Sequence, residues 1–396
     1  MRNPAIRVAL LCGIAVTLRA AAPPPSDIDR LLRTAVEQKR VPMVVAMVAD
    51  GSGVVYERAI GVPKDAIFAI ASMTKPVTSV AVMQLVEQGR VKLDEPASTY
   101  VPALRDVRVH SGGAERAPKT SVTVRHLLTH TSGFGYEFMN RHLADLVAKK
   151  AIPSATAGGD GFLRAPLVFD PGTRWEYGIS VDWLGRLVER TSGMTLEAYF
   201  HEKIFRPLRM ADSFFIVPPE KQSRLAPSYQ RNSDGNLVAQ PRQPQKSDGF
   251  FSGGGGLFST APDYLRFVRA VMAGGALDGQ RILSEASVAM MGKNQIGDLT
   301  IRAMPSMIPQ FITDGAPLPG SPDKFGLGFA LNSSTADTPR GANTMSWAGA
   351  LNTFFWIDRQ KQIGAVFLTQ SLPFLDPEMT KVVQDFDRAV YASKLR

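Results

Sequence analysis

A serine and a lysine three positions apart, Ser72 and Lys75, are the residues whose types and spacing point most directly to chemistry. They stand just ahead of an apolar pattern at Val77, Val80 and Val86 that predicts a helix, so both side chains are expected on one face of its first turn. The free N–H groups of a helix start point at such a serine, and a lysine screened from water loses part of its preference for the charged form. A neutral lysine can take the proton of a serine hydroxyl, which is otherwise a poor nucleophile. The pair therefore predicts a serine hydrolase that forms an acyl-enzyme without a histidine base.

The same Ser-x-x-Lys pattern also occurs at ordinary helix starts, where the serine caps the helix and the lysine is solvated. Tyr177 bears on this choice, because it follows the turn Pro171-Gly172 and precedes a helix predicted at 181–191. A phenol at that position can face a pocket and transfer a proton. The alternative is an aromatic ring packed at a helix entrance, which is the commoner use of tyrosine.

Two glycine-containing segments have sequences that could bind a substrate or another ligand. Gly349 ends a predicted strand, where it lets a substrate lie close to the backbone, and the next N–H, that of Ala350, can contribute to an oxyanion hole. The run 250–257 contains four consecutive glycines ahead of a predicted helix, and we interpret it as a packing turn rather than a ligand loop. It is not followed by the Gly-Lys-Ser/Thr of a phosphate-binding loop.

Other kinds of active site find little support. No Gly-x-Ser-x-Gly sequence occurs, which excludes the nucleophile elbow of α/β-hydrolases. Of the five histidines, only His126 and His130 share helical spacing, and the residue after His126 is Leu127, not the Glu of a zinc protease. A metal site on this pair is the alternative; we expect histidines that pack or cap at a helix end, and no metal or organic cofactor.

The amino terminus has the pattern of a secretory signal, with basic Arg2 and Arg7, an apolar run at 8–18 and small residues at 20–22. We expect residues 1–22 to be removed and the mature chain to be periplasmic or secreted, without a stable membrane span. An uncleaved apolar anchor is the alternative. The only cysteine, Cys12, lies in this segment, so the mature chain would have neither disulfides nor thiolate ligands.

Loss of the three arginines in this segment would lower the net charge of the chain from +9 to +6. The remaining basic residues are dispersed along the sequence, which does not suggest a nucleic-acid-binding surface.

The 396 residues, 44% of them apolar, can fill a sizeable core. Hydrophobic periodicity predicts helices at 26–40, 72–88, 123–130, 181–191, 262–273 and 379–393. It predicts strands at 41–49, 54–60, 325–331, 343–347, 352–357 and 363–369, and loops at 111–119 and 151–160. Strands at both ends of the chain imply a single domain over 23–396, with an α/β part at about 26–75 and 323–396 and a mainly helical part at about 76–322.

Four strings, in this order along the chain, resemble the serine β-lactamase and penicillin-binding superfamily: Ala71-Ser72-Met73-Thr74-Lys75, His126-Leu127-Leu128-Thr129-His130-Thr131-Ser132-Gly133, Tyr177-Gly178-Ile179 and Trp347-Ala348-Gly349. Within it the chain is most similar to class C β-lactamases and, more closely, to family VIII carboxylesterases and related acyltransferases. The resemblance covers about 26–392 and is weakest at 137–168 and 296–322.

The resemblance implies an α+β fold of the class C β-lactamase type, with an antiparallel sheet built from both chain ends and flanked by helices. It implies that Ser72 is the nucleophile and that Lys75 and Tyr177 transfer protons, with the order of their roles left open. The N–H groups of Ser72 and Ala350 would form the oxyanion hole.

The departures from the family pattern concern the substrate. Ile179 replaces the asparagine of the Tyr-x-Asn motif, and Trp347 replaces the lysine of Lys-Thr-Gly. Together with Gly349 they are the predicted substrate-binding residues. Losing an amide and a cation should weaken the selection of an anionic β-lactam by several kcal/mol. A carboxylesterase for neutral short-chain esters is therefore favoured.

Three alternatives remain. A class C-type β-lactamase or D-Ala-D-Ala peptidase would use the same serine, and an acyltransferase would differ only in accepting an alcohol in place of water. A ligand sensor that is acylated once is disfavoured by the intact Ser72, Lys75 and Tyr177. The oligomeric state is not predicted.

Overall fold

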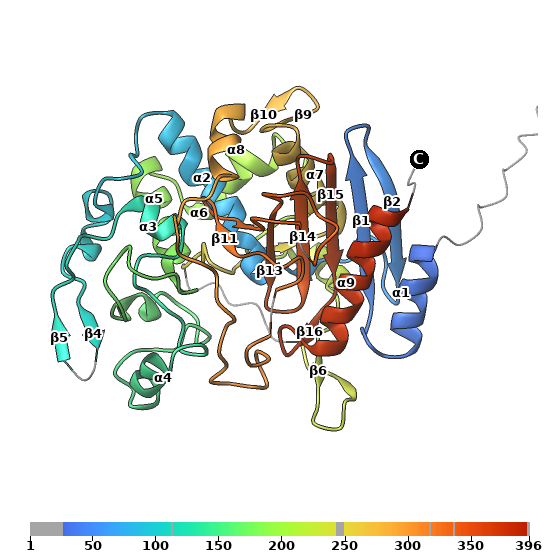
Figure 1. Cartoon of the computed structure of the whole chain (residues 1–396), viewed down its shortest axis with the longest axis horizontal. Helices are drawn as coiled ribbons and strands as arrows, with labels where there is room; N and C mark the ends of the chain where they lie inside the picture. The colour runs from blue at the N-terminus through green and yellow to red at the C-terminus, as the bar shows by residue number, and fades with distance from the viewer. Residues whose placement is uncertain (1–26, 112–113, 243–248, 317, 336, 394–396) are drawn as a thin grey trace, which may run out of the picture.

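The computed structural model describes residues 27–111, 114–242, 249–316, 318–335 and 337–393. The predicted signal at 1–22, with Cys12 in it, and position 26, the first residue of a predicted helix, lie outside them. The main element is an antiparallel seven-stranded sheet in the order β11-β12-β13-β14-β15-β1-β2 (Figure 1). Its strands are β1 (Val44–Asp50), β2 (Val54–Ile60), β11 (Lys324–Phe325), β12 (Ala330–Leu331), β13 (Met345–Gly349), β14 (Thr353–Asp358) and β15 (Ile363–Leu368).

The two ends of the chain meet inside this sheet, as the sequence predicts. β1 pairs with β15 in the register Val45 to Leu368, so an early strand lies beside a late one. Both faces of β14 are covered, because its side chains alternate between them. Phe355 packs against Tyr264 on one face, and the neighbouring Trp356 packs against Phe386 on the other. This explains why β14 is a continuous buried run rather than an alternating one.

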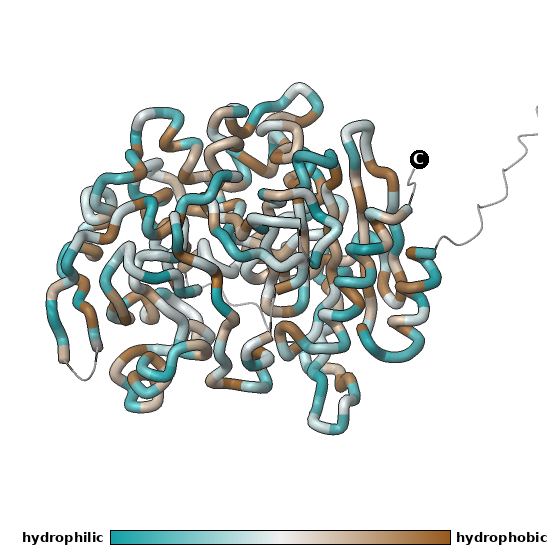
Figure 2. The backbone as a smooth tube through the Cα atoms, in the orientation of Figure 1, coloured by the Kyte–Doolittle hydropathy of each residue, from teal (hydrophilic) through white to brown (hydrophobic). Residues whose placement is uncertain are grey.

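Helices α7 (Ala261–Met272) and α9 (Pro377–Ala392) supply these covers, and α1 (Asp27–Glu37) packs beside α9 (Figure 1). Apolar and polar residues alternate along α1 and α9 in Figure 2, as expected for helices with one face on a sheet. In contrast, α2 (Thr74–Glu87) is buried over nearly its whole length and packs on α5 (Ser180–Ser192) and α6 (Leu196–Phe200).

The remaining helices are α3 (Val124–Leu128), α4 (Arg141–Ala148) and α8 (Glu285–Met291). The short strands are β3 (Phe68–Ala69), β4 (Val109–Ser111), β5 (Ala114–Arg116), β6 (Tyr229–Arg231), β7 (Leu237–Ala239), β8 (Phe258–Ser259), β9 (Ala276–Leu277), β10 (Gln280–Arg281) and β16 (Ser371–Leu372). Within the described ranges, no helix has both the length and the hydrophobicity that a membrane span requires.

Two predicted elements are wrong in detail. The strand predicted at 325–331 is a sharp reversal between β11 and β12, because Gly326 and Gly328 approach their neighbours too closely for a side chain. Gly328 has a φ of +89°, and a Cβ there would overlap Ser79. The loop predicted at 111–119 contains β5, which pairs with β4.

A buried ion pair ties the last helix to the sheet. Arg340 donates from Nε to Asp387 of α9 at 3.0 Å, and both side chains are almost completely buried. The guanidinium also lies 4.5 Å from the ring centroid of Trp356 on β14. Burial raises the pKa of Asp387, whereas the nearby Arg340 lowers it.

We predict that Asp387→Ala lowers the free energy of unfolding by about 3–5 kcal/mol, because it leaves the Arg340 charge buried without its partner. Urea unfolding followed by circular dichroism measures this. Asp385→Ala on the same helix is the control: Asp385 pairs with Lys381 and Arg388, whose side chains are exposed, and we expect a loss below about 1 kcal/mol. Equal losses in the two variants would contradict the assignment.

Candidate active site

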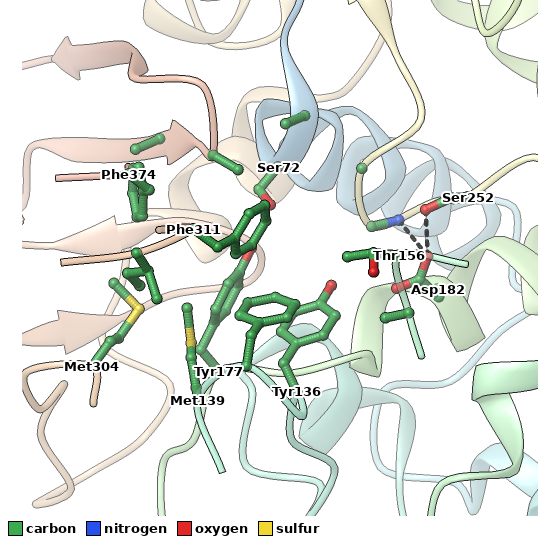
Figure 3. Close-up of a pocket in the computed structure, with 18 of the residues that line it drawn as sticks. Ser72, Tyr136, Met139, Thr156, Tyr177, Asp182, Ser252, Met304, Phe311 and Phe374 are labelled. Atoms are coloured by element: carbon green, nitrogen blue, oxygen red, sulfur yellow. Dashed lines mark hydrogen bonds between the residues drawn. The ribbon is translucent and has the colours of Figure 1, made fainter. Parts of the chain in front are cut away.

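Ser72 lies in a tight turn at the start of α2. After β3 the chain passes through Ala71, whose φ of +44° is rare for a residue with a side chain, and forms a 3-10 turn over Ala71–Met73. The prediction placed Ser72 in the first turn of the α-helix itself. The α-helix begins two residues later, at Thr74, because Pro76 has no N–H with which to bond the carbonyl of Ser72. Ser72 thus lies just before the first residue of α2 and lines a pocket (Figure 3).

The structure brings Ser72, Lys75 and Tyr177 together. Tyr177 Oη donates to Ser72 Oγ at 2.6 Å, and Lys75 Nζ donates to the same oxygen at 3.3 Å. Lys75 is 1% exposed, and its Nζ also donates to Tyr136 Oη at 3.1 Å and to the carbonyl of Gly254 at 2.7 Å. These bonds use all three donors of an ammonium group. Nζ also lies 4.6 Å from the centroid of the Tyr177 ring, within cation–π distance.

A close backbone contact fixes Tyr177. The N–H of Glu176 donates to the carbonyl of His130, and a Cβ on Gly178 would overlap the carbonyl of Phe134. The tyrosine is therefore held between two segments whose backbones touch. The sequence left open whether Tyr177 faces a pocket or packs at a helix entrance, and the structure places it in the pocket, just before α5.

The two histidines with helical spacing do not converge. His126 forms a capping box with Thr123 at the start of α3, and burial lowers its pKa. His130 packs among the rings of Tyr177, Phe325 and Trp347, and its pKa is lowered far below the usual range by burial and by the charge of Lys75. These are the capping and packing roles expected. Across the described part of the chain, no three His, Cys, Asp or Glu residues are arranged to hold a metal ion.

The end of β13 forms the opposite wall of the site. A Cβ at Gly349 would overlap the carbonyl of Ile70 and Thr353 Oγ1, so only glycine lets this strand end lie beside the turn that carries Ser72. Ala350, which follows, lines the same pocket as Ser72. Trp347 also lines it, and its ring lies 5.1 Å from that of Tyr177.

Ile179, in contrast, is not brought to the pocket. It is 2% exposed, immediately precedes α5, and is absent from the residues that line the cavity. Replacing the family's asparagine with Ile179 therefore removes an amide but does not add an apolar side chain to the pocket lining.

The pocket has a volume of about 290 Å³ and two unlike sides. In Figure 3, Ser72 lies between an apolar side with Met139, Met304, Phe311 and Phe374, and a more polar side with Tyr136, Thr156, Asp182 and Ser252.

The apolar side is built mainly from the two segments in which the family resemblance is weakest, 137–168 and 296–322. They are joined by the bond from Met307 N to the carbonyl of Phe138 and by the Phe138–Phe311 ring contact at 4.8 Å.

Sequence reasoning missed Tyr136, Asp182 and the role of the glycine run. The run was interpreted as a packing turn, yet Gly254, Gly255 and Gly256 line the pocket and the Gly254 carbonyl accepts from Lys75. Every residue type has a backbone carbonyl, so a sequence pattern cannot show that the carbonyl of Gly254 accepts a hydrogen bond from Lys75. Tyr136 and Asp182 had a weak signal, since each lies a few residues beyond a string that resembles the family.

The electrostatics of these missed residues follow from burial. Burial strongly raises the pKa of Tyr136, which keeps its phenol neutral. Burial also raises the pKa of Asp182, while the charge of Lys75 and hydrogen bonds from Ser252 and Gly254 lower it.

Comparison with known proteins agrees with this geometry. The family model described as Beta-lactamase matches residues 28–387. The acyltransferase calJ of Penicillium decumbens is 32% identical over 356 residues, 83% of this chain and 81% of the relative. The lovastatin esterase of Penicillium rubens is 29% identical over 394 residues, 92% and 97% of the two chains. The unliganded structure of simvastatin synthase (LovD) from Aspergillus terreus superimposes with a TM-score of 0.78 at 29% identity, covering 95% and 100% of the chains. This chain belongs to the beta-lactamase family.

Proposed function

We propose that this protein is a serine carboxylesterase that cleaves neutral, short-chain esters through an acyl-enzyme on Ser72. The observation that carries the proposal is the double contact of Ser72 Oγ with Tyr177 Oη and Lys75 Nζ, inside a largely apolar pocket. An activated nucleophile requires a proton-transfer group within hydrogen-bond reach, and here two such groups donate to one oxygen, either of which can accept its proton once deprotonated.

The reaction proceeds in two halves. The Lys75–Tyr177 pair, in the form that has lost one proton, accepts the proton of Ser72 as Oγ attacks the ester carbonyl. The N–H groups of Ser72 and Ala350 donate to the developing oxyanion. Tyr177 delivers the proton to the departing alkoxide, which leaves as the alcohol. Tyr177 then takes a proton from water as the water oxygen attacks the acyl-enzyme, and it returns that proton to Ser72 Oγ as the acid leaves.

The pocket supports small, neutral substrates. Its volume of about 290 Å³ lies at the lower end of the range of about 300–1,000 Å³ typical of small-molecule pockets. Trp347 lines the pocket at the position where the family pattern has a lysine, so a substrate carboxylate would meet an aromatic ring. Burying an anion there without a partner is unfavourable, whereas an alkyl chain gains contact.

We predict that Lys75→Ala and Tyr177→Phe each lower kcat for ester hydrolysis by at least ~100-fold, the usual effect of losing a positioned proton-transfer group. Steady-state kinetics with a nitrophenyl ester measures this. Tyr199→Phe, which alters a buried tyrosine of α6 outside the pocket, is the control and should keep wild-type activity. Full activity in Tyr177→Phe would mean that this tyrosine only packs.

For substrate choice, we predict that short-chain nitrophenyl esters exceed nitrocefin by at least ~10-fold in kcat/KM, equivalent to about 1.4 kcal/mol in transition-state binding. A folded Ser72→Ala variant should be inactive toward both substrates. If nitrocefin or a D-Ala-D-Ala peptide turns over faster than every ester, the esterase proposal fails in favour of a β-lactamase or peptidase.

Acyl transfer to an alcohol is the second candidate. It is favoured by a pocket that extends to both sides of Ser72 (Figure 3), and by relatives described as an acyltransferase and a synthase. Transfer uses the same acyl-enzyme and differs only in the acceptor that attacks it, so the contacts of Ser72 serve both reactions.

The two reactions are separated by their products. With nitrophenyl butyrate and increasing n-butanol, a transferase should form butyl butyrate in excess of the alcohol-to-water ratio, because the apolar pocket concentrates the alcohol. Gas chromatography of the acid and the ester measures the partition. Butyric acid as the only product at every butanol concentration would exclude transfer to this acceptor.

A further inference from the structure

A buried carboxylate adjoins the site without touching Ser72. Asp182 is the third residue of α5 and is 2% exposed. Its Oδ1 accepts from Ser252 Oγ at 2.6 Å and from the N–H of Gly254 at 3.0 Å, as the dashed lines in Figure 3 show. The phenol of Tyr136 lies near this carboxylate, and the two groups interact electrostatically.

Two of these partners are the groups that hold Lys75. Lys75 Nζ donates to Tyr136 Oη and to the carbonyl of Gly254, besides Ser72. Gly254 therefore bonds Lys75 through its carbonyl and Asp182 through its N–H, and Tyr136 bonds Lys75 and lies near the carboxylate of Asp182. In the described residues Lys75 and Asp182 form no direct ion pair, and the attraction between their charges acts over the distance that Gly254 and Tyr136 span.

The glycine turn that contains Gly254 has no room to shift. Thr78 Oγ1 of α2 donates to the carbonyl of Gly253 at 2.7 Å, which fixes the turn to the helix of Lys75. On the other side, a Cβ at Gly254 would overlap the carboxylate of Asp182, and one at Gly253 would lie 2.8 Å from the carbonyl of Val181. The turn is thus clamped between α2 and α5, and the position of Asp182 determines where the Gly254 carbonyl lies.

We infer that Asp182 is a positioning residue for acylation: through Tyr136 and Gly254 it holds the Lys75 ammonium against Ser72, and its charge balances that ammonium inside the protein. The inference rests on the proposed use of Lys75 in forming the acyl-enzyme. The titratable groups that face Lys75 are Asp182 from α5, and Tyr136, Tyr177 and His130 from the segments packed against α2.

Asp182→Asn tests the charge while keeping the shape. We expect kcat to fall by about 10- to 100-fold with KM changed less than about twofold, since misorientation of a reacting group affects the chemical step. Without the negative charge of Asp182, the hydrogen-bonded groups around the Lys75 ammonium lose a proton more readily. The acidic limb of the pH profile of kcat should therefore move to lower pH.

Asp263→Asn is the matched control. Asp263 is also the third residue of its helix, α7, is 8% exposed, and accepts from a backbone N–H (Asp212, 2.7 Å) and a serine hydroxyl (Ser213, 3.1 Å). It is not among the residues that line the pocket. This variant should retain the wild-type pH profile and kcat. A wild-type kcat and pH profile in Asp182→Asn would overturn the inference, and so would equal losses in the two variants.

A second measurement separates this inference from the proposed function. The rate at which Ser72 reacts with a nitrophenyl alkylphosphonate, followed as a mass increase, reports activation of the serine without any turnover of ester. Asp182→Asn should slow this reaction by at least ~10-fold, and Asp263→Asn should not. A wild-type protein that is phosphonylated but hydrolyses no ester would refute the esterase proposal alone. Equal phosphonylation rates in wild type and Asp182→Asn would refute the role of Asp182 alone.

Discussion

An ammonium group taken out of water must find an acceptor for each of its three protons, and this requirement organises the centre of the molecule. For Lys75 the acceptors are a hydroxyl, a phenol and a backbone carbonyl, from Ser72, Tyr136 and Gly254. The last two lie 61 and 179 positions further along the chain. Satisfying one buried charge therefore brings three segments together, and the serine is one of the groups that satisfies it. Stability and nucleophile placement thus depend on the same contacts.

Around this centre the walls lack the charges that an anionic substrate needs. Trp347 lines the pocket, and the buried His130 behind it stays neutral because burial and Lys75 both disfavour its charged form. Low polarity strengthens the hydrogen bonds at Ser72, since water competes less for them. The same apolar walls have room for an alkyl chain, so under the proposed function low polarity bears on both Ser72 and the choice of substrate. The segments 137–168 and 296–322, where the family resemblance is weakest, supply much of this apolar side.

The features of the fold and of the site that can be predicted from the sequence are those that depend on the spacing of residues near one another in the chain. The contact of Ser72 with Lys75 follows from helical periodicity, and the sheet from apolar runs at both ends of the chain. Asp182 could not be found in this way, because its role comes from contacts with residues 46 and about 70 positions away. Gly254 acts through its backbone, which residue type does not record. The exact turn at Ser72 depends on the missing N–H of Pro76, a detail that periodicity ignores.

Strands β13 and β14 contact the turn that carries Ser72, although they lie far from it in the sequence. Thr353 Oγ1 bonds the carbonyl of Ile70 across 283 positions of sequence, and the strand that ends at Gly349 lies against the same carbonyl. During translation the serine and lysine emerge early, whereas the strands that complete the pocket emerge among the last residues. Contacts of such long sequence separation also form slowly. The nascent chain therefore carries Ser72 and Lys75 for most of its synthesis without the strands that complete the pocket around them.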